Sequence, residues 1–213
     1  MTPFLYSKSK HQRREQPPQY KNYKRYKPYL RREFERKCIY CRLPDTLKGK
    51  ESFGVEHYKP KQKNLFPELE LVYNNLFYAC NCCNSRKGAF WPSQEQLNRD
   101  EFIPNPCDHV MFQHLKYAGS MVETKTAAGD LCKEILDLND EDSVLYREFL
   151  LGVIETCAHE RDKWQALIIY IDSEIDNPNT SPEHQKKLLQ ERPFVETKLN
   201  ECIERVKKLL GDS

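Results

Sequence analysis

Four of the nine cysteines form two pairs, each with two residues between its members. Cys38 and Cys41 make the first pair, Cys80 and Cys83 make the second, and 38 residues separate the pairs. Four thiolates at this spacing suit one closed tetrahedral zinc site, which stabilises a short segment without a large core. Redox dithiols are the competing interpretation, but no thioredoxin-like strand–helix pattern surrounds either pair. Cys82 is predicted to be a bystander, because only Cys80 and Cys83 repeat the spacing of the first pair.

A carboxylate, an imidazole and two carboxamides lie between or beside these pairs. Glu56 and His57 are adjacent, Asn75 follows in the same interval, and Asn84 comes directly after Cys83. Oxygen donors hold a hard divalent cation, and a neutral imidazole accepts a proton from water near physiological pH. A Glu-His pair alone is a weak signal, and the flanking cysteines and Asn84 strengthen it.

Composition limits the class of protein. The 213 residues are 38% apolar and 31% charged, which is polar for a globular protein but too aromatic for disorder throughout. The longest apolar run, Ala166 to Ile171, is far too short to span a membrane. The N-terminus lacks the apolar core of a signal peptide, and metal-type cysteine pairs suit a reducing compartment. We therefore expect a cytoplasmic protein with no membrane contact.

Charge is distributed unevenly along the chain. Residues 8–37 carry 12 Lys and Arg against 3 acidic residues, and residues 38–92 carry 8 against 5. Residues 93–213 carry 14 against 24. The basic front half predicts a polyanion such as DNA as its partner, with Tyr rings available for stacking on bases. A solvated tail that aids solubility is the alternative for the first 34 residues.

Periodicity predicts an α+β protein in three segments, 1–34, 35–92 and 93–213. Residues 52–57 alternate as a strand, residues 68–79 are predicted to be helical or loop-like, and a helix is expected from Asn84. The resulting order is a hairpin and then a helix. Residues 110–122 indicate a second hairpin, and the remainder shows helical apolar stripes, one of them beginning at Pro182.

The cysteine pairs and the polar residues together resemble the HNH endonucleases, members of the ββα-metal superfamily, over roughly residues 36–91. The matching positions are Cys38, Cys41, Glu56, His57, Asn75, Cys80, Cys83, Asn84 and Lys87. The resemblance implies a zinc-stabilised ββα-metal nuclease module followed by a mainly helical domain. It also implies that Glu56 and Asn84 bind the catalytic metal, that His57 is the general base and that Asn75 braces the loop. Asn at the third motif position and Glu at the first depart from the literal pattern.

The mechanism implied by this resemblance is single-metal hydrolysis of a phosphodiester. Mg²⁺ or Mn²⁺ stabilises the charge that develops at the phosphate, while His57 deprotonates an in-line water. Four basic side chains are candidate phosphate ligands: Lys59, Lys61, Arg86 and Lys87.

A looser resemblance connects the chain to HNH proteins of Septu-like and retron-linked anti-phage systems, which work beside an AAA-type ATPase. It rests on residues 58–61, 73–80 and 102–108 and on the helical back half. If it holds, the acidic helical part docks on the ATPase. Two other functions stay open: a non-catalytic zinc-containing DNA-binding module, and an interaction subunit in which the nuclease fold is a scaffold.

Overall fold

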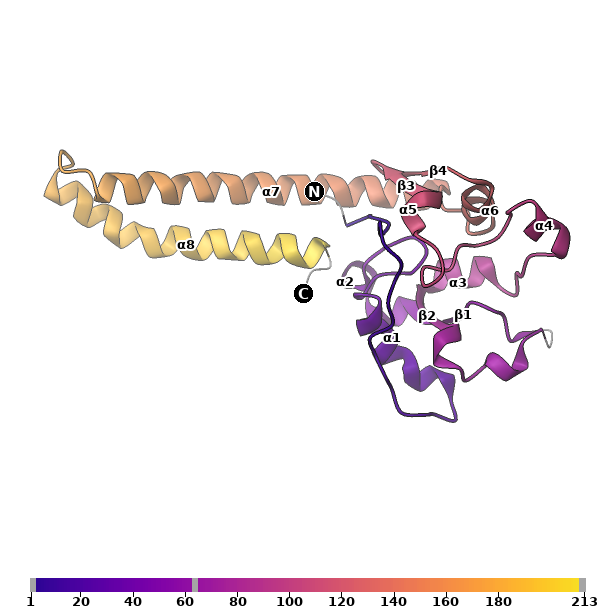
Figure 1. Ribbon diagram of the computed structural model, residues 1–213. Helices are drawn as coiled ribbons and strands as arrows, with labels where there is room; N and C mark the ends of the chain where they lie inside the picture. The colour runs from indigo at the N-terminus through magenta and orange to yellow at the C-terminus, as the bar shows by residue number, and fades with distance from the viewer. Residues whose placement is uncertain (1–2, 63–64, 211–213) are drawn as a thin grey trace. The chain divides into compact units, whose positions relative to one another are not determined.

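The computed structural model describes residues 3–62 and 65–210 and contains two compact units (Figure 1). The first unit extends to Glu148 and the second begins at Phe149, and the three segments 1–34, 35–92 and 93–213 stay a prediction. In chain order the elements of the first unit are a 3-10 helix η1 (Tyr23–Tyr26), α1 (Lys27–Glu33), α2 (Asp45–Lys48), β1 (Phe53–His57), β2 (Leu76–Cys80), α3 (Asn81–Lys87), α4 (Gln94–Asn98), α5 (Met111–His114), β3 (Leu115–Ala118), β4 (Met121–Thr124) and α6 (Ala127–Ile135). Helix α7 (Glu141–Ile175) begins in the first unit and continues into the second, which also contains α8 (Pro182–Leu210).

An antiparallel hairpin followed at once by a helix forms the centre of the first unit. Strand β1 pairs with β2 so that Phe53 lies opposite Cys80 and His57 opposite Leu76. All five residues of β2 are buried, and α1 and α3 both contact this strand. The predicted order of hairpin and helix is confirmed. The prediction of helix or loop for residues 68–79 is wrong from residue 76 onward, because a strand buried on both faces lacks the alternation that identifies a half-exposed strand.

The basic N-terminal segment packs against β2 and β3. Its helix α1 contacts β2, and the rings of Phe4 and Tyr6 contact Tyr117 of β3. Its core side chains are at most 5% exposed, and they are Phe4, Tyr6, Tyr26 and Leu30. The guanidinium of Arg13 lies 4.6–5.2 Å from the ring centroids of Phe34, Tyr73 and Phe77. It also donates hydrogen bonds to the backbone carbonyls of Asn74 and Leu76, at 3.2 and 2.8 Å. A few side chains of the predicted arm are therefore part of the hydrophobic core of the unit, while residues 7–25 are exposed or half-buried.

A second hairpin and α6 complete the first unit. Strands β3 and β4 pair antiparallel, and Gly119 makes the turn between them with a φ of +61°. Gly129 in α6 lies so close to the backbone of α5 that a Cβ there would come 2.2 Å from the carbonyl oxygen of His114. A second hairpin is present as predicted, but its strands cover residues 115–124 and not 110–122, because residues 111–114 form the short helix α5.

The second unit is an antiparallel pair of helices with an apolar seam. The seam contains Ile168 and Ile171 of α7 and Leu188, Val195 and Leu199 of α8, with Trp164, Ile175 and Ile203 packed against it. Arg192 bridges the helices through a 2.7 Å ion pair with Asp172. Pro182 is the first residue of α8, as predicted, and Pro193 lies inside the helix. A proline there leaves the carbonyl of Leu189 without its helical donor.

The mainly helical character predicted for the back half is confirmed by these two long helices. Across residues 3–62 and 65–210, none of the helices combines the length and the apolar character that crossing a bilayer requires.

Replacing Phe4 by Ala should lower the free energy of unfolding of the first unit by about 3–5 kcal/mol, because a fully buried ring is lost. The matched control is Leu5→Ala, since Leu5 is 63% exposed, and it should change stability by no more than about 0.5 kcal/mol. Urea denaturation of the full chain measures both. Equal effects of the two substitutions would show that the N-terminal segment is not packed as described.

Candidate active site and metal centre

Two separate backbone turns bring the four cysteines together. Cys38 and Cys41 lie in a knuckle closed by a hydrogen bond from the amide of Arg42 to the carbonyl of Cys38, at 3.0 Å. Arg42 has a positive φ of 53°, which lets the chain reverse directly after Cys41. Cys80 ends β2 and Cys83 lies in the first turn of α3. The Ile39 amide donates to the Tyr78 carbonyl at 2.9 Å, so the first knuckle is attached to the strand that carries the second pair.

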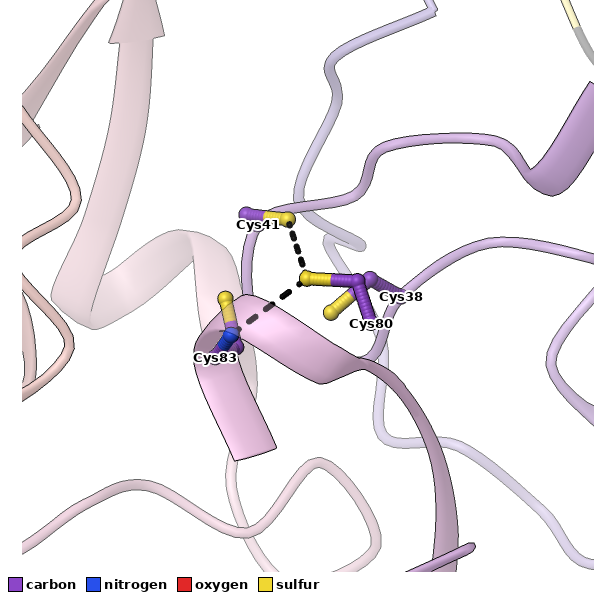
Figure 2. A group of neighbouring side chains, drawn as sticks. All are labelled: Cys38, Cys41, Cys80 and Cys83. Carbon is purple, nitrogen blue, oxygen red and sulfur yellow. Dashed lines mark hydrogen bonds between the residues drawn. The ribbon is translucent and has the colours of Figure 1, made fainter. Parts of the chain in front are cut away.

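The four sulfur atoms converge on one point (Figure 2). All of them lie within 4.8 Å of one another, and the sulfurs of Cys41 and Cys80 are 3.7 Å apart. Tetrahedral zinc with bonds of about 2.3 Å requires sulfur–sulfur distances of roughly 3.8 Å. The donor set therefore fits a closed structural zinc ion, which leaves no position for a catalytic water.

The four sulfurs differ in their preferred protonation state. Hydrogen bonds from Cys38, Cys41 and Cys83 lower the pKa of the Cys80 thiol, and the backbone amide of Cys83 adds a further hydrogen bond. Hydrogen bonds to the neighbouring sulfurs and burial raise the pKa of the Cys41 and Cys83 thiols, so a bound cation is needed to hold all four as thiolates. Cys82 is exposed and outside the cluster, as its position in the sequence predicted.

Glu56 points to the side of β1 that faces α3. Its exposed fraction is 2%, and its Oε1 lies 2.7 Å from the ammonium nitrogen of Lys87. The hydroxyl of Tyr40 donates to the same oxygen at 3.3 Å. Burial raises the pKa of Glu56, while the charge of Lys87 opposes that shift. The carboxylate is thus already paired with a cation inside the protein.

His57 is the last residue of β1 and is held in one tautomer. Its Nε2 lies 3.0 Å from the carbonyl oxygen of Glu70, and a carbonyl only accepts, so Nε2 carries the proton. Nδ1 is then the nitrogen that can accept a proton. The ring also packs edge-on against Tyr23 of η1, with centroids 4.7 Å apart. Burial lowers the pKa of His57, which keeps the imidazole neutral near pH 7.

Asn75 braces the loop that orients His57. Its side chain accepts from the Lys59 amide at 2.8 Å and donates to the Lys59 carbonyl at 3.0 Å. It also donates to the carbonyl of Leu69 at 3.3 Å, one residue before the carbonyl of Glu70 that fixes the imidazole. Asn75 therefore connects the end of β1 to the segment that sets the His57 tautomer.

Asn84 lies where α3 crosses β1. Its amide nitrogen is 3.5 Å from the carbonyl oxygen of Val55. A Cβ added to Gly54 would stand 3.4 Å from the same nitrogen, so the helix and the strand approach closely here. Glu56 makes its contacts with Lys87 and Tyr40. Over the described ranges, the four cysteines form the only group of three or more Cys, His, Asp or Glu side chains close enough to hold an ion.

Comparison with known proteins agrees with this geometry. Residues 38–90 match the model of the HNH endonuclease family. The hairpin, helix and four-cysteine cluster lie within those residues. Residues 38–90 form an HNH endonuclease domain.

The chain is also similar to the Septu protein PtuB of Bacillus thuringiensis. The two are 31% identical over 138 residues, which is 61% of this chain and 49% of PtuB. The chain thus spans about half the length of that curated relative. No solved structure matches the chain.

The candidate phosphate ligands of the HNH domain differ in exposure. Lys59 and Lys61 are half-buried, and Lys61 pairs with Glu70 at 2.5 Å. Arg86 pairs with Asp140 at 2.9 Å and donates to two carbonyls at the end of α6, so it ties α3 to the chain that follows. Lys87 is buried. In this arrangement Arg86 and Lys87 are engaged inside the protein, whereas Lys59 and Lys61 remain partly accessible.

Three residues of the HNH site were missed by sequence reasoning: Tyr23, Tyr40 and Glu70. Tyr40 lies between Cys38 and Cys41, and this place inside the first cysteine pair was the signal that the sequence offered. Glu70 contributes a backbone carbonyl, which any residue type can supply. Tyr23 comes from the N-terminal segment, and only folding places it at His57.

Cys83→Ser should remove the zinc and unfold the first unit, because the ion supplies much of the folding free energy of such a small module. Cys82→Ser is the matched control and should retain one zinc per chain. Metal content by mass spectrometry and thermal melting measure the two effects. Retention of zinc and of a native-like melting curve by Cys83→Ser would contradict the closed four-sulfur site.

Proposed function

We propose that the chain is an endonuclease that hydrolyses phosphodiester bonds in DNA, with His57 as its general base. The observation that carries the proposal is the neutral, tautomer-fixed imidazole at the end of β1 in an HNH endonuclease domain. Membership of residues 38–90 in that family supports the reaction class, and the substrate is part of the proposal.

The chemistry assigned to His57 follows from its hydrogen bonds. The Glu70 carbonyl accepts the Nε2 proton, so Nδ1 takes a proton from a water molecule as that water attacks phosphorus. A phosphorus–oxygen bond forms, the bond to the 3′ oxygen breaks, and that oxygen leaves with a proton from solvent. The resulting imidazolium is stabilised by the carbonyl of Glu70.

The HNH family suggests a divalent metal, and the oxygen donors Glu56 and Asn84 would favour Mg²⁺ or Mn²⁺. As the structure arranges them, each of these two side chains already has a partner inside the protein. The Glu56 carboxylate holds the Lys87 ammonium, and the Asn84 amide nitrogen faces the carbonyl of Val55.

We propose DNA as the polyanion that the basic front half binds. Lys21, Lys24 and Arg25 are exposed and lie beside Tyr23, whose ring contacts His57. A strand that reaches His57 would therefore pass these cations, which can neutralise phosphates without base contacts.

We further propose that the chain acts in anti-phage defence with an AAA-type ATPase. The similarity to Septu protein PtuB supports this proposal. The second unit exposes large apolar side chains suited to a protein partner, among them Ile169, Tyr170, Leu189 and Phe194. Co-purification of such an ATPase with the full chain is its direct test.

His57→Ala should reduce nicking of supercoiled plasmid by about 10²–10⁴-fold, because the proton acceptor is lost. The matched control is His159→Ala, an exposed histidine of α7, which should cleave at the wild-type rate. Zinc content and melting temperature verify that both variants are folded, and His57→Asn replaces the Ala variant if burial of the site makes it unstable. Undiminished cleavage by folded His57 variants would remove His57 as the general base, whereas a wild-type chain that binds DNA without cleaving it would support a non-catalytic DNA-binding module or an interaction subunit.

Replacing Lys21, Lys24 and Arg25 together by Gln should weaken DNA binding and flatten its salt dependence, by about 0.9 in log–log slope for each lost phosphate contact. These substitutions are preferable to deleting the segment, since deletion would also remove Phe4 and the rest of its buried core. The control replaces the exposed Lys186, Lys187 and Lys208 by Gln, with the same change in net charge. Fluorescence anisotropy over a salt series measures the slopes, and identical slopes for both triple variants would place the DNA elsewhere.

A further inference from the structure

The strongest unexplained feature of the HNH domain is its buried ion pair. Lys87 ends α3, and its ammonium lies 2.7 Å from the Glu56 carboxylate. The two side chains are 1% and 3% exposed. The same ammonium donates to the backbone carbonyl of His57 at 3.0 Å. One cation therefore joins α3, the carboxylate and the residue that carries the proposed base.

Each member of such a pair stabilises the other, because a buried charge without a partner of opposite sign is strongly unfavourable. A buried carboxylate without a partner loses its hydration and has no compensating interaction, so removing one member is far more disruptive than removing both. Tyr40 adds a hydrogen bond to the same carboxylate oxygen. These contacts fix the end of β1, and with it the position of His57.

The ammonium also occupies the position beside Glu56 Oε1 that a metal ion bound to that oxygen would need. Lys87 is three residues after Asn84 on α3, so both lie on one helix face, toward β1. A divalent ion bound to Oε1 at about 2.1 Å would stand very close to the ammonium, and the two positive charges would repel each other.

We propose that Lys87 is the resident cation of Glu56. The two side chains act as one positioning unit for the His57 end of β1, and a divalent ion reaches Glu56 only by displacing the ammonium. The inference deepens the proposed nuclease function by reassigning Glu56 from metal ligand to positioning residue. Its tests use metal binding and melting, so they can fail or succeed independently of cleavage.

Mn²⁺ titration of the zinc-loaded full chain, followed by the electron paramagnetic resonance signal of free Mn²⁺, is the first test. Lys87→Met should bind Mn²⁺ at least about tenfold more tightly than wild type, because the competing charge is gone. Glu56→Gln should bind like wild type, and the double variant Glu56→Gln/Lys87→Met should lose the gain. Weaker binding by Glu56→Gln, or no gain in Lys87→Met, would overturn the proposal and restore Glu56 as a ligand.

Thermal melting is the second test and remains decisive if a single variant folds poorly. Lys87→Met and Glu56→Gln should each lower the melting temperature by at least about 5 °C, and the double variant should melt above both. Lys116→Met is the matched control, because it breaks an ion pair with Glu123 that is 42% and 49% exposed, and it should stay within about 2 °C of wild type. A double variant that melts at or below the less stable single variant would show that the two side chains do not act as a unit.

Discussion

The rest of the first unit depends on four sulfur atoms that meet at one point. Two of them belong to a knuckle after α1 and two to the corner between β2 and α3, so the cluster closes a loop of 38 residues. The hairpin inside that loop has only two short strands, which would be marginal in water. Zinc at the cluster would stabilise it by joining ends that the apolar core alone holds weakly. The N-terminal segment adds apolar packing, because Tyr26 contacts Tyr73 just before β2 while Phe4 and Tyr6 contact Tyr117 of β3.

Once the hairpin is held, its polar residues are positioned by backbone hydrogen bonds. Asn75 fixes the segment next to Glu70, and the Glu70 carbonyl sets the proton of His57. On the other side of β1, Lys87 binds both Glu56 and the His57 carbonyl. The imidazole is thus constrained from two directions, through its ring and through its backbone. A general base benefits from such constraint, because its orientation is set before the substrate arrives.

The two units use different means of stabilisation. The first combines a sulfur cluster, a buried ion pair and aromatic packing around Arg13. The second relies on an apolar seam between two long helices, with exposed ion pairs that contribute little. The second unit also exposes large apolar side chains that do not pack in its own seam.

Residue type and spacing alone determined the four-cysteine cluster, the exclusion of Cys82, the order of hairpin and helix and the helical back half. Each of these follows from local rules: ligand spacing, alternation and helical periodicity. Tertiary structure decided the features that depend on contacts between residues distant in sequence. Strand β2 was hidden because its burial on both faces removes alternation. Part of the basic N-terminal segment is buried because its few apolar residues meet β2 and β3, which are distant in sequence. Whether Glu56 faces a metal ion or Lys87 depends on how α3 crosses β1, because helix and strand approach closely at Gly54, and the linear spacing of the motif does not specify that crossing.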